Sequence, residues 1–394
     1  MTLLTDLELK DQKLVIGLMS GTSADGIDAV LVEIEGYGIR TRIQTKAFVT
    51  IPYSGAFREY LLKIAKGDFG GSAELSQLNF YLGKLLANAC LAVCEKAGIT
   101  PEKIDFVGSH GHTVFHHPLK EHYFDFPVSS TLQLGEASVI CEALGCPVVS
   151  DFRVRDVAAG GYGAPLVPYT EYILYAEKDK MVALQNIGGI GNITCLPPNC
   201  SLDQVSAFDT GPGNMVMDAL CTIITNSQKR YDENGELAAR GNVNFELLNF
   251  MMNDEYLHKL PPKTTGREMY GEAYVSKILK KSEQLGLSLV DTLATATMFT
   301  AKCIQYSVEN FFLAIPDRLI VGGGGAYNPI LMEMIRQCLP NCEVLRNEDI
   351  GLDSGAKEAV AFALLANETI GGMYNNAPSA TGASHPVVMG KISF

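Results

Sequence analysis

The stretch Leu14–Ile34, with the sequence LVIGLMSGTSADGIDAVLVEI, decides the fold. Two short apolar runs, 14–19 and 29–34, flank a small polar loop. Short runs rich in β-branched residues on either side of turn residues predict a β-hairpin. The loop is rich in glycine and hydroxyl side chains, and a glycine-rich turn lets backbone N–H groups approach an anion closely. The stretch therefore favours a phosphate-binding hairpin, with an ordinary hairpin loop as the alternative.

Two carboxylates in this loop indicate a metal ion beside the phosphate. Asp25 and Asp28 would repel a bare phosphate. They suit Mg²⁺, which prefers carboxylate and water oxygens as ligands. We therefore expect these two residues to hold Mg²⁺ that arrives with the phosphate.

Length and charge exclude several classes of protein. A chain of 394 residues exceeds the size at which one core keeps growing, which predicts two domains. The net charge of −13 argues against a nucleic-acid partner and against an anionic membrane surface. No uncharged apolar run is long enough to span a membrane, and the N-terminus lacks the apolar core of a signal peptide. We expect a cytoplasmic protein whose ten cysteines are mostly buried.

The pattern of the first half begins again near residue 170. Apolar runs at 181–185 and 191–196 flank a second glycine-rich turn, 186–190. A further run, 205–208, ends in Asp209-Thr210-Gly211-Pro212-Gly213-Asn214 and is followed by a helical pattern. Glycine-rich turns and helix N-termini both favour phosphate. The two halves thus share a plan, which we interpret as an internal duplication.

Four consecutive glycines form the third glycine-rich turn. Gly322–Gly325 follow a buried strand at 318–321 and lead, through Ala326, into a helix at 329–338. Bare backbone at such a turn can carry a base or a ribose, with generic strand-to-helix packing as the alternative. Three such turns spread over both halves suit a clamp around a nucleoside triphosphate. Asp209 is then the best candidate for the base that phosphoryl transfer needs.

Three polar segments could line a substrate site. Residues 109–113 follow a predicted strand at 104–108, and residues 151–165 combine arginines, aspartates and glycines. Arginine can fork onto a carboxylate or phosphate, although a solvated surface loop is the alternative. Residues 263–268 offer hydroxyls and cations for a phosphate or a sugar. The histidines of 110–122 lack an acidic or cysteine partner at ligand spacing, which disfavours a metal cluster.

Six blocks in this order resemble the anhydro-N-acetylmuramic acid kinases of the sugar kinase, Hsp70 and actin superfamily. The resemblance runs from about Leu14 to the end of the chain. It implies an α/β protein with a two-domain actin-like ATPase fold, a duplicated ribonuclease H-like fold with a central nucleotide cleft. We expect an N-terminal domain at 1–150, rejoined by 366–394, and a C-terminal domain at 151–365 with an insertion around 231–268. The blocks are residues 21–28, 109–111, 151–168, 208–214, 263–268 and 322–328.

The resemblance also implies a reaction. Its substrates are ATP, with Mg²⁺, and 1,6-anhydro-N-acetylmuramic acid, a small sugar released from the bacterial cell wall. Water adds across the 1,6-anhydro bridge while O6 is phosphorylated, giving N-acetylmuramic acid 6-phosphate and ADP. In this scheme Asp209 activates the water that attacks the anomeric carbon. A homodimer is left open by the sequence.

The site residues carried over by this resemblance fall into two groups. Those assigned to ATP are Gly21, Thr22, Ser23, Asp25, Gly26, Asp28, Gly211, Gly213, Asn214, Gly323, Gly324, Gly325 and Ala326. Those assigned to the sugar are His112, Thr113, Arg155, Asp156, Gly163, Asp209 and Glu358, with Arg155 as the partner of the lactyl carboxylate.

Two positions depart from the usual pattern of the family. Tyr162 and His112 stand where the family commonly has glutamine, in loops expected to line the sugar site. A levoglucosan-type kinase, acting on the anhydro sugar without the N-acetyl and lactyl groups, is therefore an alternative. A sugar-independent ATPase of the actin or Hsp70 kind is a further alternative, but it would leave segments 151–168 and 263–268 without a role.

Overall fold

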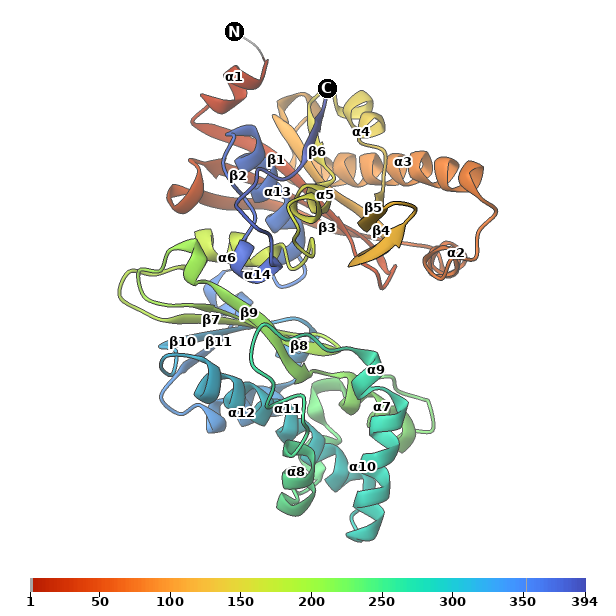
Figure 1. Ribbon diagram of the computed structural model, residues 1–394, viewed down its shortest axis with the longest axis vertical. Coiled ribbons are helices and arrows are strands. Elements are labelled where there is room, and N and C mark those ends of the chain that lie inside the picture. The colour runs from red at the N-terminus through yellow and green to blue at the C-terminus, as the bar shows by residue number, and fades with distance from the viewer. Residues whose placement is uncertain (1–2, 352) are drawn as a thin grey trace. The chain divides into compact units, whose positions relative to one another are not determined.

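The computed structural model describes residues 3–351 and 353–394. The chain divides into two compact units (Figure 1). Unit 1 comprises the residues up to Leu174 together with Gly355–Phe394, and unit 2 comprises Tyr175–Ser354. Each unit contains one β-sheet with helices packed on it.

Unit 1 is built on a sheet with the strand order β12-β6-β4-β1-β2-β3, with β5 paired to β4. β1, β2 and β3 form an antiparallel meander, whereas β4 runs parallel to β1 and β6 runs parallel to β4. Its elements are α1 Leu3–Glu8, β1 Gln12–Ser20, β2 Gly26–Glu35, β3 Arg42–Pro52, α2 Gly55–Ala65, α3 Ser72–Ala97, β4 Phe106–Tyr123, β5 Phe126–Leu134, α4 Ala137–Leu144, β6 Val148–Ser150, α5 Phe152–Ala158, α6 Val167–Tyr175, α13 Lys357–Ile370, α14 Pro378–Thr381 and β12 Lys391–Ser393.

Unit 2 is built on a five-stranded sheet with the order β11-β10-β7-β8-β9. β7, β8 and β9 form an antiparallel meander, β10 runs parallel to β7, and β11 runs parallel to β10. Its elements are β7 Val182–Ile187, β8 Ile190–Leu196, β9 Ser206–Pro212, α7 Met215–Ile224, α8 Phe245–Met252, α9 Arg267–Tyr270, α10 Glu272–Gln284, α11 Leu289–Phe311, β10 Arg318–Gly322, α12 Pro329–Cys338 and β11 Glu343–Arg346.

The two sheets share one plan. In each, the first strand is followed by an antiparallel meander on one side and by two parallel strands on the other. β1 therefore corresponds to β7, and the β1–β2 turn corresponds to the β7–β8 turn. This is the duplicated ribonuclease H-like plan of an actin-like fold, so the predicted fold class is confirmed.

The helices bury the apolar faces that the sequence marks. The long helix α3 buries Leu78, Leu82, Leu86 and Val93 against unit 1, as its apolar spacing predicts. In unit 2, the core lies between the sheet and a helical layer dominated by α11, whose buried face is rich in alanine and threonine. Small side chains on that face let the helix lie close to its neighbours.

One close approach shapes the core of unit 1. Helix α13 crosses β1 and β4 where both strands carry glycine, at Gly17 and Gly108. A methyl group on Gly17 would overlap the backbone carbonyl of Ala359, and one on Gly108 would overlap that of Phe362. Helix α13 of the C-terminal segment can pack this closely on the sheet of unit 1 because glycine leaves the strand backbone without a side chain at both crossings.

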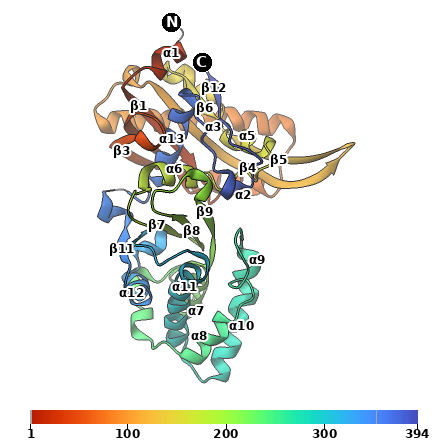
Figure 2. The same cartoon turned by 60° about the vertical axis from the view of Figure 1, so that its left-hand side comes forward.

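Two sequence-based assignments of secondary structure are wrong. The segment 109–113 is not a loop, because β4 continues to Tyr123 and pairs with β5 in a long hairpin (Figure 2). The first half of the polar segment that begins at Asp151 forms helix α5, whereas residues 159–165 form the expected loop.

The limits of the compact units differ from the predicted domain limits. Unit 1 extends through Leu174 rather than 150, and the chain returns to it at Gly355 rather than 366. The physical reason is that α5, α6 and the whole of α13 carry contacts to unit 1, among them a bond from Tyr169 to Glu368. Near the N-terminus, Leu3–Glu8 form α1 and Lys13 is buried.

We expect Gly17→Ala to lower the free energy of unfolding by roughly 2–4 kcal/mol, because a methyl group has no room against the α13 backbone. Gly55→Ala is the matched control, since a methyl group there meets nothing within 4 Å and the residue begins helix α2. We expect that variant to be neutral or slightly more stable. Urea unfolding of both variants measures the difference, and equal stability would contradict the proposed packing.

Candidate functional site

The β1–β2 turn of unit 1 is held in shape by hydrogen bonds. The N–H of Ala24 donates to the carbonyl of Gly21 at 3.0 Å, and that of Tyr53 donates to the carbonyl of Asp25 at 3.0 Å. Arg58, from helix α2, donates its Nε–H to the carbonyl of Ser23 at 3.2 Å. The turn is thus preorganised, as an anion-binding turn requires. The side chains of Thr22 and Ser23 are exposed on it.

The two carboxylates of this turn have partners on neighbouring elements. Asp25 lies 3.1 Å from Nε of Arg58, and both side chains are exposed. Asp28 accepts a hydrogen bond from the Thr50 hydroxyl at 2.6 Å. Within residues 3–351 and 353–394 there is no group of three or more histidine, cysteine or acidic side chains that could hold a metal ion. A cation here would need phosphate and water to complete its ligands.

An arginine that the sequence analysis did not select is fixed beside this turn's sheet. Arg153 donates its Nε–H to Nε2 of His110 at 3.0 Å and donates from Nη1 to the carbonyl of Gly163 at 2.6 Å. His110 in turn contacts the Gly111 carbonyl through Nδ1 at 3.0 Å. Burial and the adjacent Arg153 charge lower the pKa of His110 to about 3, so the ring is neutral. These hydrogen bonds hold the guanidinium group of Arg153 in a fixed orientation.

His112 is buried and bonded inside unit 1. Its Nδ1 lies 3.0 Å from the Ser20 hydroxyl, which also contacts the Tyr53 hydroxyl at 2.9 Å. Burial lowers the pKa of His112 to about 4. The neutral ring therefore supports the end of β1, where the phosphate turn begins. Its predicted contact with the sugar stays a prediction.

Asp156 has a different environment from the one expected for a substrate-binding residue. Its carboxylate is fully buried and accepts hydrogen bonds from the Gly163 N–H, the Asn376 amide and the Thr381 hydroxyl, each at 2.8 Å. These donors come from the C-terminal tail and from the loop after α5. Asp156 therefore stabilises the loop that carries Gly163 and Tyr162.

The other amino acids predicted to bind the sugar, Glu358, Thr113 and Arg155, lie in different environments. Glu358, at the first turn of α13, keeps solvent contact, yet desolvation by surrounding protein atoms raises its pKa against the opposing charges of Lys357 and Arg153. Thr113 accepts a hydrogen bond from Gln133 at 3.2 Å. Arg155 is exposed. Unit 1 thus brings Arg153 and Glu358 within electrostatic reach of each other.

Asp209 of unit 2 is held by two hydrogen bonds to one of its carboxylate oxygens. Its Oδ2 accepts hydrogen bonds from the Thr264 hydroxyl and the Thr265 N–H, both at 2.9 Å. Its Oδ1 accepts none from any residue that the structure describes. Desolvation raises the pKa of Asp209, while the two hydrogen bonds and the Lys263 charge act in the opposite direction. A carboxylate with one anchored and one available oxygen has the geometry of a general base.

The two residues that follow β9, Gly213 and Asn214, have a structural role that the sequence did not indicate. The N–H groups of Gly213 and Asn214 donate to the carbonyls of Gly189 and Gly188, at 2.9 and 2.7 Å. These two amides are therefore occupied and do not face a phosphate as predicted. They instead hold the β7–β8 turn, which is the counterpart of the β1–β2 turn.

The four-glycine turn, Gly322–Gly325, packs against the end of β7, where the β7–β8 turn begins. A side-chain methyl on Gly323 would overlap Asn186 and the Ile187 carbonyl, and one on Gly325 would overlap the Ile187 side chain. Gly324 lies near the amide of Asn214. Unit 2 thus gathers the turns after β7, β9 and β10 into one cluster. The sequence analysis identified the glycine-rich turn at 186–190 but did not assign it to ATP.

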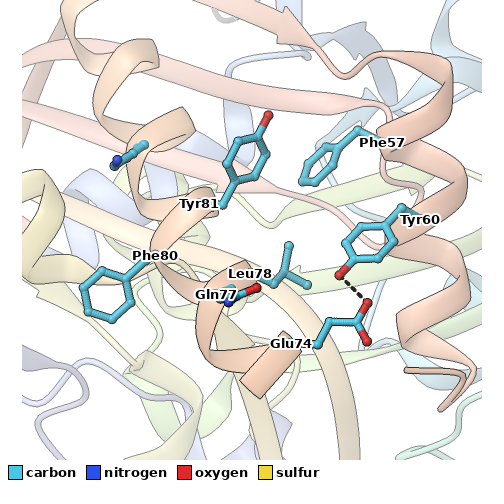
Figure 3. Close-up of a pocket in the computed structure, with 8 residues that line it drawn as sticks. Phe57, Tyr60, Glu74, Gln77, Leu78, Phe80 and Tyr81 are labelled. Carbon is cyan, nitrogen blue, oxygen red and sulfur yellow. Dashed lines mark hydrogen bonds between the residues drawn. The ribbon is translucent and has the colours of Figure 1, made fainter. Parts of the chain in front are cut away.

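A separate cavity of about 550 Å³ opens between α2 and α3 (Figure 3). Aromatic rings, including Phe57, Tyr60 and Tyr81, form much of its wall. The carboxylate of Glu74 at its edge already accepts hydrogen bonds from Tyr60 and from the Gly70 N–H. None of the predicted site residues lines this cavity.

Comparisons with known proteins identify relatives along almost the whole chain. A family model described as anhydro-N-acetylmuramic acid kinase matches residues 13–394. The protein of that name from Caldanaerobacter subterraneus subsp. tengcongensis is 50% identical over 386 residues, covering 98% of each chain. The one from Clostridioides difficile is 46% identical over 380 residues, covering 96% of this chain and 97% of its own.

Solved structures also match over most of the chain, at low identity. A ROK family glucokinase from Streptomyces griseus, in complex with glucose and AMPPNP, is 13% identical with a TM-score of 0.37, covering 89% of this chain and 98% of its own. Component A of the (R)-2-hydroxyglutaryl-CoA dehydratase from Acidaminococcus fermentans is 11% identical with a TM-score of 0.45, covering 90% and 99%.

We expect Gly213→Ala to weaken ATP binding at least about tenfold, because a methyl group would overlap the Gly188 carbonyl and displace the β7–β8 turn. Gly55→Ala is the control, since a methyl group there meets nothing within 4 Å and the residue begins α2, outside the proposed ATP site. Calorimetric titration with a non-hydrolysable ATP analogue measures both affinities. Equal losses in the two variants would contradict the role assigned to Gly213.

Proposed function

Because the chain belongs to the anhydro-N-acetylmuramic acid kinase family, we propose that its own residues carry out the ring-opening phosphorylation of 1,6-anhydro-N-acetylmuramic acid. The enzyme is a phosphotransferase that uses ATP. It opens the 1,6-anhydro ring with water and phosphorylates O6, giving N-acetylmuramic acid 6-phosphate and ADP in peptidoglycan recycling. The family match over residues 13–394 carries this assignment.

Asp209 is the general base in this proposal. Its Oδ1 takes a proton from water as the water oxygen bonds to the anomeric carbon, and the bond from that carbon to O6 breaks. O6 then bonds to the γ-phosphorus of ATP, and ADP leaves. The support for this role is the anchored Oδ2 and the partial burial of the carboxyl, which raises its pKa toward that of a useful base.

The phosphate turns are proposed to be the two equivalent hairpin turns. Gly21–Gly26 serves unit 1. In unit 2 the N–H of Gly189 takes the place that we first assigned to Gly211, Gly213 and Asn214, because the N–H of its neighbour Gly188 donates to the Ile190 carbonyl at 3.2 Å. The support is the shared topology together with the occupied amides of Gly213 and Asn214. Gly323–Ala326 stay the proposed adenosine support. Thr113, Arg155 and Glu358 stay proposed sugar residues, with Arg153 added beside them.

Mg²⁺ is proposed to accompany ATP at Asp25 and Asp28. The donor set fits a hydrated hard cation, since both are carboxylates on the phosphate turn of unit 1. When bound, Mg²⁺ would neutralise charge on the phosphate oxygens. Asp25 would then exchange its exposed pair with Arg58 for the metal and its water.

A cytoplasmic homodimer is the proposed setting of the enzyme. All ten cysteines are free, which suits a reducing compartment. The described residues include no helix long and apolar enough to cross a membrane.

Phe115, Phe124 and Phe126 expose large apolar surfaces on the β4–β5 hairpin, which suits burial against a second copy. Sedimentation of the purified protein measures the assembly, and a monomer at all concentrations would contradict it.

Asp209→Asn should leave ATP binding nearly intact and reduce turnover by a factor of about 100 or more, because an amide cannot take the water proton. The change keeps the shape of the side chain and its partners Thr264 and Thr265. Sugar-dependent ADP release and ATP-analogue titration measure the two quantities. Retained turnover would exclude Asp209 as the base.

A panel of anhydro sugars tests the substrate. We expect the muramic anhydro sugar to be phosphorylated, with weaker turnover of its glucosamine analogue, which lacks the lactyl carboxylate, and of levoglucosan. Turnover of levoglucosan equal to that of the muramic sugar would support the alternative anhydro-sugar kinase. ADP release that is indifferent to every sugar would support a sugar-independent ATPase instead.

A further inference from the structure

One short segment of unit 2 binds Asp209 through both its backbone and its carboxyl group. The Lys263 carbonyl accepts from the Asp209 N–H at 3.1 Å. The next two residues, Thr264 and Thr265, donate to Oδ2. On the other side, the Tyr256 hydroxyl donates to the Asp209 carbonyl at 2.9 Å. The base is therefore held at three of its polar groups, and Oδ1 is the one oxygen of its carboxylate left available within the described chain.

We propose that residues 263–265 form a positioning segment for the base, in which the Thr264 hydroxyl selects the carboxyl rotamer that presents Oδ1 to the attacking water. This proposal rests on the role of Asp209 given above. Neither Thr264 nor Lys263 touches a reacting atom in this scheme. Both act on the reaction through the orientation and the charge of Asp209.

Lys263 explains why the segment is rigid. Its side chain is buried, and its ammonium group donates to the Leu257 carbonyl at 2.8 Å and lies 3.4 Å from that of Tyr256. The ammonium also lies over the rings of Phe311 and Tyr256, at 4.5 and 4.9 Å from their centres. A buried charge is costly unless it is hydrogen-bonded or paired, so these contacts tie residues 256–257 firmly to the segment. Tyr256 and Lys263 thus contact each other, and each also forms a hydrogen bond with the backbone of Asp209.

The same segment shapes the charge environment of the base. Hydrogen bonds from Thr265 and Thr264 favour the carboxylate, as does the charge of Lys263, whereas desolvation favours the neutral acid. The other titratable groups packed around Lys263 are Cys303 of α11 and Tyr256. Loss of the Thr264 hydrogen bond therefore raises the pKa of Asp209. A smaller fraction of the enzyme then carries an ionised base at acidic pH.

Thr264→Val tests the proposal, because the side chain is exposed and the change is isosteric, so the fold is not threatened. We expect kcat to fall about tenfold, with unchanged affinity for an ATP analogue, because the carboxyl group loses one of its two anchors. We also expect the acidic limb of the pH profile of kcat/KM to move to higher pH. Thr264→Ser keeps the hydroxyl and should restore both properties.

A neighbouring threonine provides a matched comparison. The Thr265 hydroxyl is buried and bonds to no described residue, while its N–H still binds Oδ2. Thr265→Val should therefore move the acidic limb less than Thr264→Val does. Thr264→Val with wild-type kcat and pH profile, beside an inactive Asp209→Asn, would overturn the positioning role alone. An active Asp209→Asn would overturn the proposed function together with it.

Discussion

A carboxylate that serves as the proposed base must be shielded from bulk water and yet stay ionised, and the surroundings of Asp209 in unit 2 meet these opposing demands. Desolvation favours the neutral form of Asp209, which would be useless as a proton acceptor. Two hydrogen bonds to Oδ2 and the nearby ammonium of Lys263 oppose this effect. The net effect raises the pKa of Asp209, so its carboxylate is more basic than an exposed one. Such a balance requires three consecutive residues, 263–265, to be fixed in space.

The contact of this segment with Asp209 gives a reason for the burial of the Lys263 side chain. A lysine buried among Phe208, Phe311 and Tyr256 would be a poor choice for stability alone. Burial lowers its pKa to about 8, so its charge is present at neutral pH and below. Asp209 lies on β9 and Gly213 directly follows it, so this strand links the proposed base to the glycine turns of unit 2. The proposed chemistry and the proposed phosphate contacts would thus depend on the same strand.

Much of this organisation could be predicted from the sequence because it is local. The Leu14–Ile34 hairpin, the long helix α3 and the glycine turns are each specified by residues close together in the chain. The duplication was also visible, since each half repeats hairpin, strand and helix. By contrast, the bonds that Asp156 accepts from Asn376 and Thr381 join residues more than two hundred positions apart, and no local pattern reports them. Likewise, periodicity could not reveal that the Gly213 amide is used inside unit 2.

The shared topology also shows how the two hairpin turns can differ in function. The β1–β2 turn carries Asp25, two hydroxyl side chains and, at the start of the next strand, Asp28. The corresponding turn, Gly188-Gly189, has no acidic side chain. Its two carbonyl groups accept hydrogen bonds from the amides of Gly213 and Asn214. Carboxylates attract a cation, whereas bare backbone offers only N–H groups to an anion. The carboxylates of the longer β1–β2 turn therefore suit the proposed cation, whereas the two-residue β7–β8 turn offers only backbone N–H groups to the proposed phosphate.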